Sequence, residues 1–133
     1  MPRAAPAFFN SYNGLIEDIH VEGCRRNQIS QIAGEDINYN NLTFGPSEGV
    51  LPGACIDFEA DRAVDINRRV SINDVKGNNV RAGIVFQGVK SRIEQATLSN
   101  VHLSGVAKNN GVTANNSEAV SYTHLTLPTT PYV

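Results

Sequence analysis

Ile16-Glu17-Asp18-Ile19-His20-Val21 is the first of four copies of one pattern: an apolar residue, any residue, Asp or Asn, then apolar, any, apolar. The copies begin 23, 33 and 26 residues apart, and each is followed by a second short strand signal. The other copies are Tyr39–Phe44, Ile72–Gly77 and Leu98–Leu103, and the second signals centre on Ile29, Ile56, Ile84 and Val112. A repeat of this length with two strands per unit predicts an all-β solenoid, a parallel β-helix of about four turns.

The Asp or Asn of each copy marks a sharp bend between two strands. Short side chains of this kind tolerate left-handed backbone geometry and hydrogen-bond to nearby backbone. Residues two apart in a strand share a face, so the apolar ones should stack from winding to winding inside the coil. The expected bend residues are Asp18, Asn41, Asp74 and Asn100, and the expected inner columns are Ile16, Tyr39, Ile72 and Leu98, then Ile19, Leu42, Val75 and Val101, then Val21, Phe44 and Leu103, with a gap at Gly77.

The second strand of each winding should point its central apolar residue inward, with Phe58 and Phe86 following two residues later. One outward position of the first strand is occupied in successive windings by His20, Thr43, Lys76 and His102. The two histidines would be about 14 Å apart, too far to share a metal, so we expect both to be solvated.

Composition limits the partners. The chain has 133 residues, 41% of them apolar, which suits one packed domain. With 11 basic and 13 acidic side chains, the chain lacks the excess of positive charge that predicts binding of nucleic acid. No run approaches the ~20 apolar residues of a membrane span. Cys24 and Cys55 are expected to be buried free thiols. The N-terminus is a poor export signal, and a coil with open ends suggests an internal piece of a longer protein.

Residues 120–133 depart from the repeat. The stretch Val120–Thr129 (VSYTHLTLPT) has neither the Asp or Asn position nor the spacing, and it resembles the in-frame translation of a transposon-end adaptor used in sequencing libraries. An ordinary Thr/Pro-rich linker is the alternative. We therefore expect an irregular segment at 1–12, a β-helix fragment at 13–119 and a non-native tail at 120–133.

The densest group of candidate functional residues is Asp57, Glu59 and Asp61, directly after a Gly/Pro-rich loop at 45–53. If Phe58 points inward, strand alternation sends Asp57 and Glu59 outward, with Asp61 next. Repulsion among the carboxylates should raise at least one pKa, as a general acid requires, and paired carboxylates are what glycosidic bond cleavage uses. The trio could instead hold Ca²⁺, or form a solvated acidic strand edge.

Arginines form the second group of candidates. Arg26 and Arg81 precede the second strands of their windings and should share one column, with the acidic strand on the winding between them. Because arginine pairs bidentately with carboxylates, these residues could hold an acidic sugar. The arginines, including Arg68 and Arg69, could instead form salt bridges to the acidic trio without any ligand.

Residues 13–115 resemble the right-handed parallel β-helix repeat proteins of the pectate-lyase-like superfamily. The resemblance rests on Asn27–Ser30 (NQIS), Gly53–Glu59 (GACIDFE) and Asn110–Thr113 (NGVT). The stretch that ends at Asp61 is similar to the AGIDIEPN segment of bacterial and phage members, with Ala60 in place of Pro. The resemblance implies a right-handed coil and contact with carbohydrate, because most members are secreted polysaccharide lyases, glycoside hydrolases, epimerases or phage tailspikes.

Two functions follow as expectations. The first is a polysaccharide lyase or glycoside hydrolase that uses Asp57, Glu59 and Asp61, with Arg26 or Arg81 steadying an acidic sugar. The second is a non-catalytic carbohydrate-binding or structural stalk, as in an adhesin or a tailspike, the latter as a homotrimer. Both imply secretion or a virion or cell surface, a polysaccharide partner, no nucleic acid, no membrane, and no cofactor or metal apart from Ca²⁺ as an option.

Overall fold

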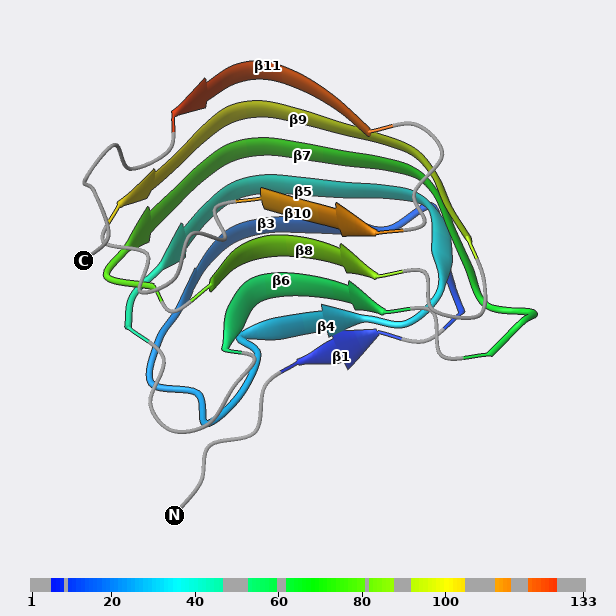
Figure 1. The fold of residues 1–133 in the computed structure, drawn as a ribbon, viewed down its shortest axis with the longest axis horizontal. Coiled ribbons are helices and arrows are strands. Elements are labelled where there is room, and N and C mark those ends of the chain that lie inside the picture. Colours follow the sequence, from blue (N-terminus) through cyan, green and yellow to red (C-terminus); the bar gives the residue numbers. More distant parts are fainter. Residues whose placement is uncertain are drawn as a thin grey trace.

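The computed structural model describes residues 6–8, 10–46, 53–59, 62–80, 82–87, 92–104, 112–115 and 120–126. These residues form eleven strands and no helix, arranged in two parallel sheets (Figure 1). Sheet A contains β1 (Ala7–Phe8), β4 (Ile29–Gln31), β6 (Ala54–Glu59), β8 (Ala82–Gln87) and β10 (Val112–Asn115). Sheet B contains β2 (Ser11–Tyr12), β3 (Leu15–Val21), β5 (Gly34–Phe44), β7 (Ile66–Asn78), β9 (Arg92–Ser104) and β11 (Val120–Thr126).

The chain alternates between the two sheets as it advances along the coil. It passes from β4 to β5, from β6 to β7 and from β8 to β9, and every pairing between neighbouring windings is parallel. These three windings have a neighbour on both sides, and β1–β3 and β10–β11 form the end windings. The predicted all-β parallel solenoid is therefore confirmed, with three fully flanked turns where about four were expected.

Strand register confirms the predicted alignment of the repeats. One register column in sheet B contains Ile16, Tyr39, Ile72 and Leu98, and one in sheet A contains Ile29, Ile56, Ile84 and Val112. In the three flanked windings, the residues of these two columns are buried wherever the structure describes their side chains.

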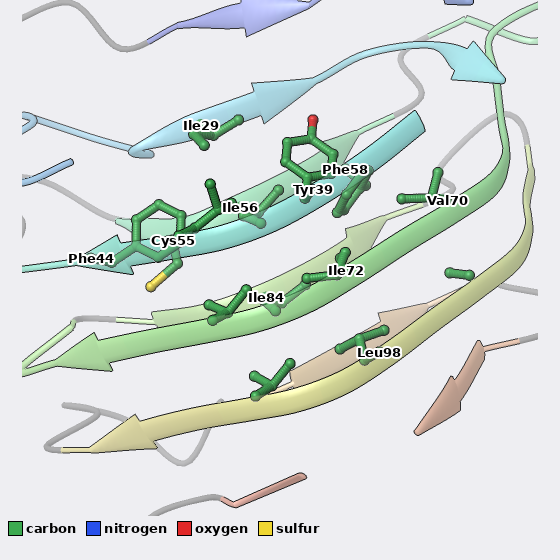
Figure 2. Packing of buried hydrophobic residues seen from close by; sticks show 14 of the residues in the cluster. Ile29, Tyr39, Phe44, Cys55, Ile56, Phe58, Val70, Ile72, Ile84 and Leu98 are labelled. Atoms are coloured by element: carbon green, nitrogen blue, oxygen red, sulfur yellow. The ribbon is translucent and has the colours of Figure 1, made fainter. Parts of the chain in front are cut away.

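Phe58 lies fully buried at the centre of the coil (Figure 2). Its ring meets Tyr39 of sheet B edge-on, with centroids 5.8 Å apart, and stacks on Phe86 of the next winding at 4.8 Å. The Tyr39 hydroxyl donates a hydrogen bond to Oε1 of Gln31 at 2.8 Å, so this ring is buried without an unpaired polar group. Such aromatic pairs add roughly 0.5–1.5 kcal/mol beyond the burial of their area. They connect the two sheets and successive windings.

Gly77 occupies the inward position that holds Val21, Phe44 and Leu103 in the other windings. A Cβ atom at Gly77 would lie 2.9 Å from Cδ2 of Leu103 and 3.2 Å from Cγ1 of Val80. The gap expected from the sequence is thus occupied by these two neighbouring side chains.

Each long strand of sheet B bends at the predicted position. The backbone φ angles of the four Asp and Asn residues are positive, between 53° and 57°. A second row of left-handed residues lies five positions earlier in each winding, and the sequence pattern did not indicate it. The first row contains Asp18, Asn41, Asp74 and Asn100, and the second contains Asn13, Asp36, Arg69 and Gln95.

The coil continues into the segment that the sequence marked as a tail. β11 (Val120–Thr126) pairs with β9, placing Val120 beside Ala96 and Thr126 beside His102. Strand pairing therefore does not stop at Val120. The adaptor origin of residues 120–133 concerns the gene rather than the fold, and it stays a prediction.

Candidate functional site

Asp57 points outward from β6 but does not reach solvent. Phe58 is buried inside, as predicted, yet the Asp57 residue is itself only 1% exposed. Asn27, in the segment between β3 and β4, donates from Nδ2 to Oδ2 of Asp57 at 2.7 Å and accepts the Ala54 N–H on Oδ1 at 3.1 Å. The expectation of a solvent-facing Asp57 is therefore wrong, because a residue of the preceding winding covers the carboxylate.

Glu59 and Arg26 are the other predicted site residues that the structure describes. Glu59 is half-buried at the end of β6, and Arg26 is exposed before β4. Asp61 and Arg81 lie outside the described residues. The described residues thus show no pair of solvent-facing carboxylates on β6, and the catalytic role of the trio stays a prediction.

Arg68 and Arg69 bind carboxylates of sheet B. Arg68 contacts Glu35 of the preceding winding at 3.1 Å and Glu94 of the following winding at 2.8 Å. Arg69 pairs with Asp36 at 2.6 Å and with Glu35 at 3.2 Å. Register explains these partners, because Glu35, Arg68 and Glu94 occupy one column.

The ion pairs also shift the pKa values of their members. The hydrogen bond from Arg69 holds the pKa of Asp36 below its usual value. The hydrogen bond to Glu94 raises the pKa of Arg68, and the hydrogen bond to Asp36 raises that of Arg69. These guanidinium groups are therefore engaged in joining three windings.

The outer face of sheet B between the two rows of bends is polar and uncharged in the flanked windings. We call this surface the polar panel: two columns of small amide and hydroxyl side chains that cross β5, β7 and β9. Ser99 donates to Asn73 Oδ1, and Thr97 donates to Ser71 at 3.4 Å. The columns are Asn38, Ser71 and Thr97, and Asn40, Asn73 and Ser99.

A groove lies beside the polar panel, along the bends at Asn41, Asp74 and Asn100. It has a volume of about 370 Å³ and is also lined by Leu42 and by the outward residues Thr43, Lys76 and His102. A second hollow of about 290 Å³ shares Lys76 and His102 and extends the groove to Asn78, Leu103 and Ser104. The surface thus runs across windings, which is the direction in which the repeats succeed one another.

The sequence placed the outward residues of this groove in one column, and the register confirms it. His20 pairs with Thr43, Thr43 with Lys76, and Lys76 with His102. Both histidines are exposed, as expected. The groove itself was missed, because it forms where three neighbouring strands bend together and no single repeat signals that curvature.

No grouping of three His, Cys, Asp or Glu side chains able to hold a metal occurs in the described part of the chain. Cys24 and Cys55 are both buried thiols, as predicted, and burial raises the pKa of the Cys55 thiol. Among the described residues, no helix has the length and apolar character needed to span a membrane.

Protein-family models, curated proteins and solved structures give no significant match. The parallel β-solenoid is therefore supported by the strand pairing itself. Carbohydrate contact stays an expectation from the resemblance to the pectate-lyase-like superfamily.

Proposed function

We propose that this chain is a segment of a carbohydrate-binding β-solenoid that holds a polysaccharide along the outer face of sheet B. The observation that carries the proposal is the combination of the polar panel with the adjoining groove. Together they offer hydroxyl, amide and charged groups on three consecutive windings. These are the donors and acceptors that match sugar hydroxyl groups.

The repeat of the coil suits a polymeric ligand. Neighbouring parallel strands lie about 4.8 Å apart, so each polar column presents similar groups at regular steps. A polysaccharide lying across the windings would meet Asn40, Asn73 and Ser99 in succession, while a single sugar would meet only one or two of them. Many weak contacts along one chain add up to useful affinity through effective concentration.

Binding is favoured over cleavage by the position of Asp57. A general acid must reach the proton or atom that it serves within hydrogen-bond distance. Asp57 is enclosed and bonded to Asn27, so its carboxylate does not line the groove. We therefore favour a non-catalytic stalk or adhesin over an enzyme. Such a protein would lie on a virion or cell surface, and it would be a homotrimer if it is a tailspike.

A glycan array followed by titration with the best polysaccharide tests the proposal. Ser71→Tyr would place a ring on the polar panel and should weaken binding at least tenfold. Val64→Tyr is the matched control, because Val64 is 74% exposed and lies off the panel. Circular dichroism should show that both variants fold. Equal affinities of Ser71→Tyr and the parent chain would contradict binding at this face.

The same titration separates binding from catalysis. The bound polymer is incubated with the protein, and its length and new reducing ends are measured. An unchanged polymer agrees with the proposal. If the polymer is shortened, and if a folded variant that combines Asp57→Ala with Glu59→Ala no longer shortens it, the lyase or hydrolase would be favoured instead.

A further inference from the structure

We propose that the groove contains a subsite for an anionic substituent of the polysaccharide, a sulfate or a carboxylate, centred on Lys76. The inference rests on the proposed function and adds the chemical class of the ligand. We call the column His20, Thr43, Lys76 and His102 the basic row. It runs along the groove, and three of its members line it.

Lys76 is the central cation of this subsite. It is exposed in the groove, and it forms no ion pair within the described part of the chain. The arginines of sheet B differ in this respect, since Arg68 and Arg69 are bound to carboxylates of neighbouring windings. The ammonium group of Lys76 is thus available to a ligand, while those guanidinium groups are not.

The neighbours of Lys76 extend the subsite across three windings. Thr43 and His102 lie one step away on either side, at the spacing of adjacent strands, about 4.8 Å. A hydroxyl and an imidazole can each donate a hydrogen bond to an anionic oxygen. His20 is less accessible to a ligand, because its Nδ1 lies 2.7 Å from Thr43 Oγ1 and its Nε2 lies 3.4 Å from Glu22.

Among the described residues that line the groove, Asp74 is the one with an acidic side chain. It occupies the bend two residues before Lys76, and its carboxylate should oppose an anion. The flanking windings carry Asn41 and Asn100 at the same register position. Asn is thus compatible with this backbone, which makes Asp74→Asn a substitution that removes the opposing charge without disturbing the bend.

The test compares dextran with dextran sulfate, which share one backbone, in titrations at low ionic strength. We expect tighter binding of dextran sulfate. Lys76→Thr should weaken it about fivefold, because the ammonium group is lost while Thr is the residue that the neighbouring winding carries at this position. His102→Thr should weaken it about twofold, and Asp74→Asn should strengthen it about twofold.

Arg25→Thr is the matched control, since it removes one exposed positive charge outside the groove. If Arg25→Thr lowered the affinity for dextran sulfate as much as Lys76→Thr does, the attraction would depend on net charge alone and the subsite would be overturned. Equal binding of dextran and dextran sulfate, or no binding of dextran sulfate, would also overturn it. Binding of neutral glycans in the array would still leave the proposed function standing.

Sodium sulfate as a competitor, with sodium chloride at the same ionic strength, distinguishes the source of the anion. Stronger displacement of dextran sulfate by sulfate supports a subsite that accepts the free ion. Equal displacement by the two salts, together with the loss in Lys76→Thr, supports a subsite that recognises the anion when it is carried on a polymer.

Discussion

Arg69 and Asp36 both adopt left-handed backbone, on adjacent windings, and their side chains form a bidentate ion pair. Arg69 donates from Nε to Oδ1 of Asp36 at 2.6 Å and from Nη2 to Oδ2 at 2.9 Å. Left-handed geometry is unfavourable for a long side chain such as arginine, whereas Asp can stabilise it by local hydrogen bonds. The ion pair therefore joins the bend at Asp36, where the residue type suits left-handed backbone, to the bend at Arg69, where it does not.

Acid should remove the contribution of this ion pair to stability. Because the pKa of Asp36 is lower in the folded chain than its ordinary value of 3.8, the pair stabilises the fold above that pH. The contribution is lost as the pH falls through the lowered pKa. Asp36→Asn lacks it at every pH, so its deficit in melting temperature should be visible at pH 6 and should shrink as the pH falls below 3.8. Asp74→Asn, at a bend with no ion pair among the described residues, is the control, and a deficit of Asp36→Asn that does not shrink below pH 3.8 would contradict this origin.

Asn27→Ala should destabilise the fold by about 2 kcal/mol, because it removes a donor to the buried Asp57 carboxylate and an acceptor for the Ala54 N–H. Urea unfolding followed by circular dichroism measures the difference. Val64→Ala, which shortens a side chain that is 74% exposed, should change the free energy of unfolding by less than about 0.5 kcal/mol. An Asn27→Ala variant as stable as the parent would show that Asp57 does not depend on this contact.

Asn100→Val should cost about 1–2 kcal/mol, since a β-branched residue is disfavoured in left-handed geometry. Asn100→Asp should be tolerated, because Asp18 and Asp74 occupy the same position in other windings. Thermal unfolding of the two variants, side by side, is the measurement. Equal melting temperatures would indicate that the bend does not require Asp or Asn.

Gly77→Val should destabilise the coil by about 1–3 kcal/mol, although Val is the residue of another winding at this position. A Cβ atom would come within 2.9 Å of Leu103, so the larger side chain would displace Leu103 and Val80. Gly77→Val combined with Leu103→Ala should recover part of the loss. Failure of the double variant to improve on Gly77→Val in urea unfolding would argue against this clash.

The inward columns and the first row of bends could be predicted from the sequence, because they depend on the alternation of residues along a strand and on the residue type at a bend. The column of Tyr39, Ile72 and Leu98 and the bend at Asn100 follow from residues close together in the chain. The second row of bends was missed because Arg69 and Gln95 are not residue types that signal left-handed backbone.

The candidate site was less predictable, because it depends on contacts between windings. Asp57 is covered by Asn27, which lies 30 residues earlier, and Arg69 binds Asp36, which lies 33 residues earlier. Both were expected to engage other partners. Outward orientation along a strand could be predicted, whereas access to solvent depended on the neighbouring winding.

In every winding of sheet B from β3 to β9 the left-handed residues of the two rows stand five positions apart, while the connections outside the long strands differ in length. The spacing between the two bends is therefore constant, whereas the length of the connecting loops varies. Loops of new size or chemistry could be exchanged at the ends of these strands without shifting the pairing of Ile72 with Tyr39 or Leu98. Such a coil can diversify what it recognises while its interior stays the same.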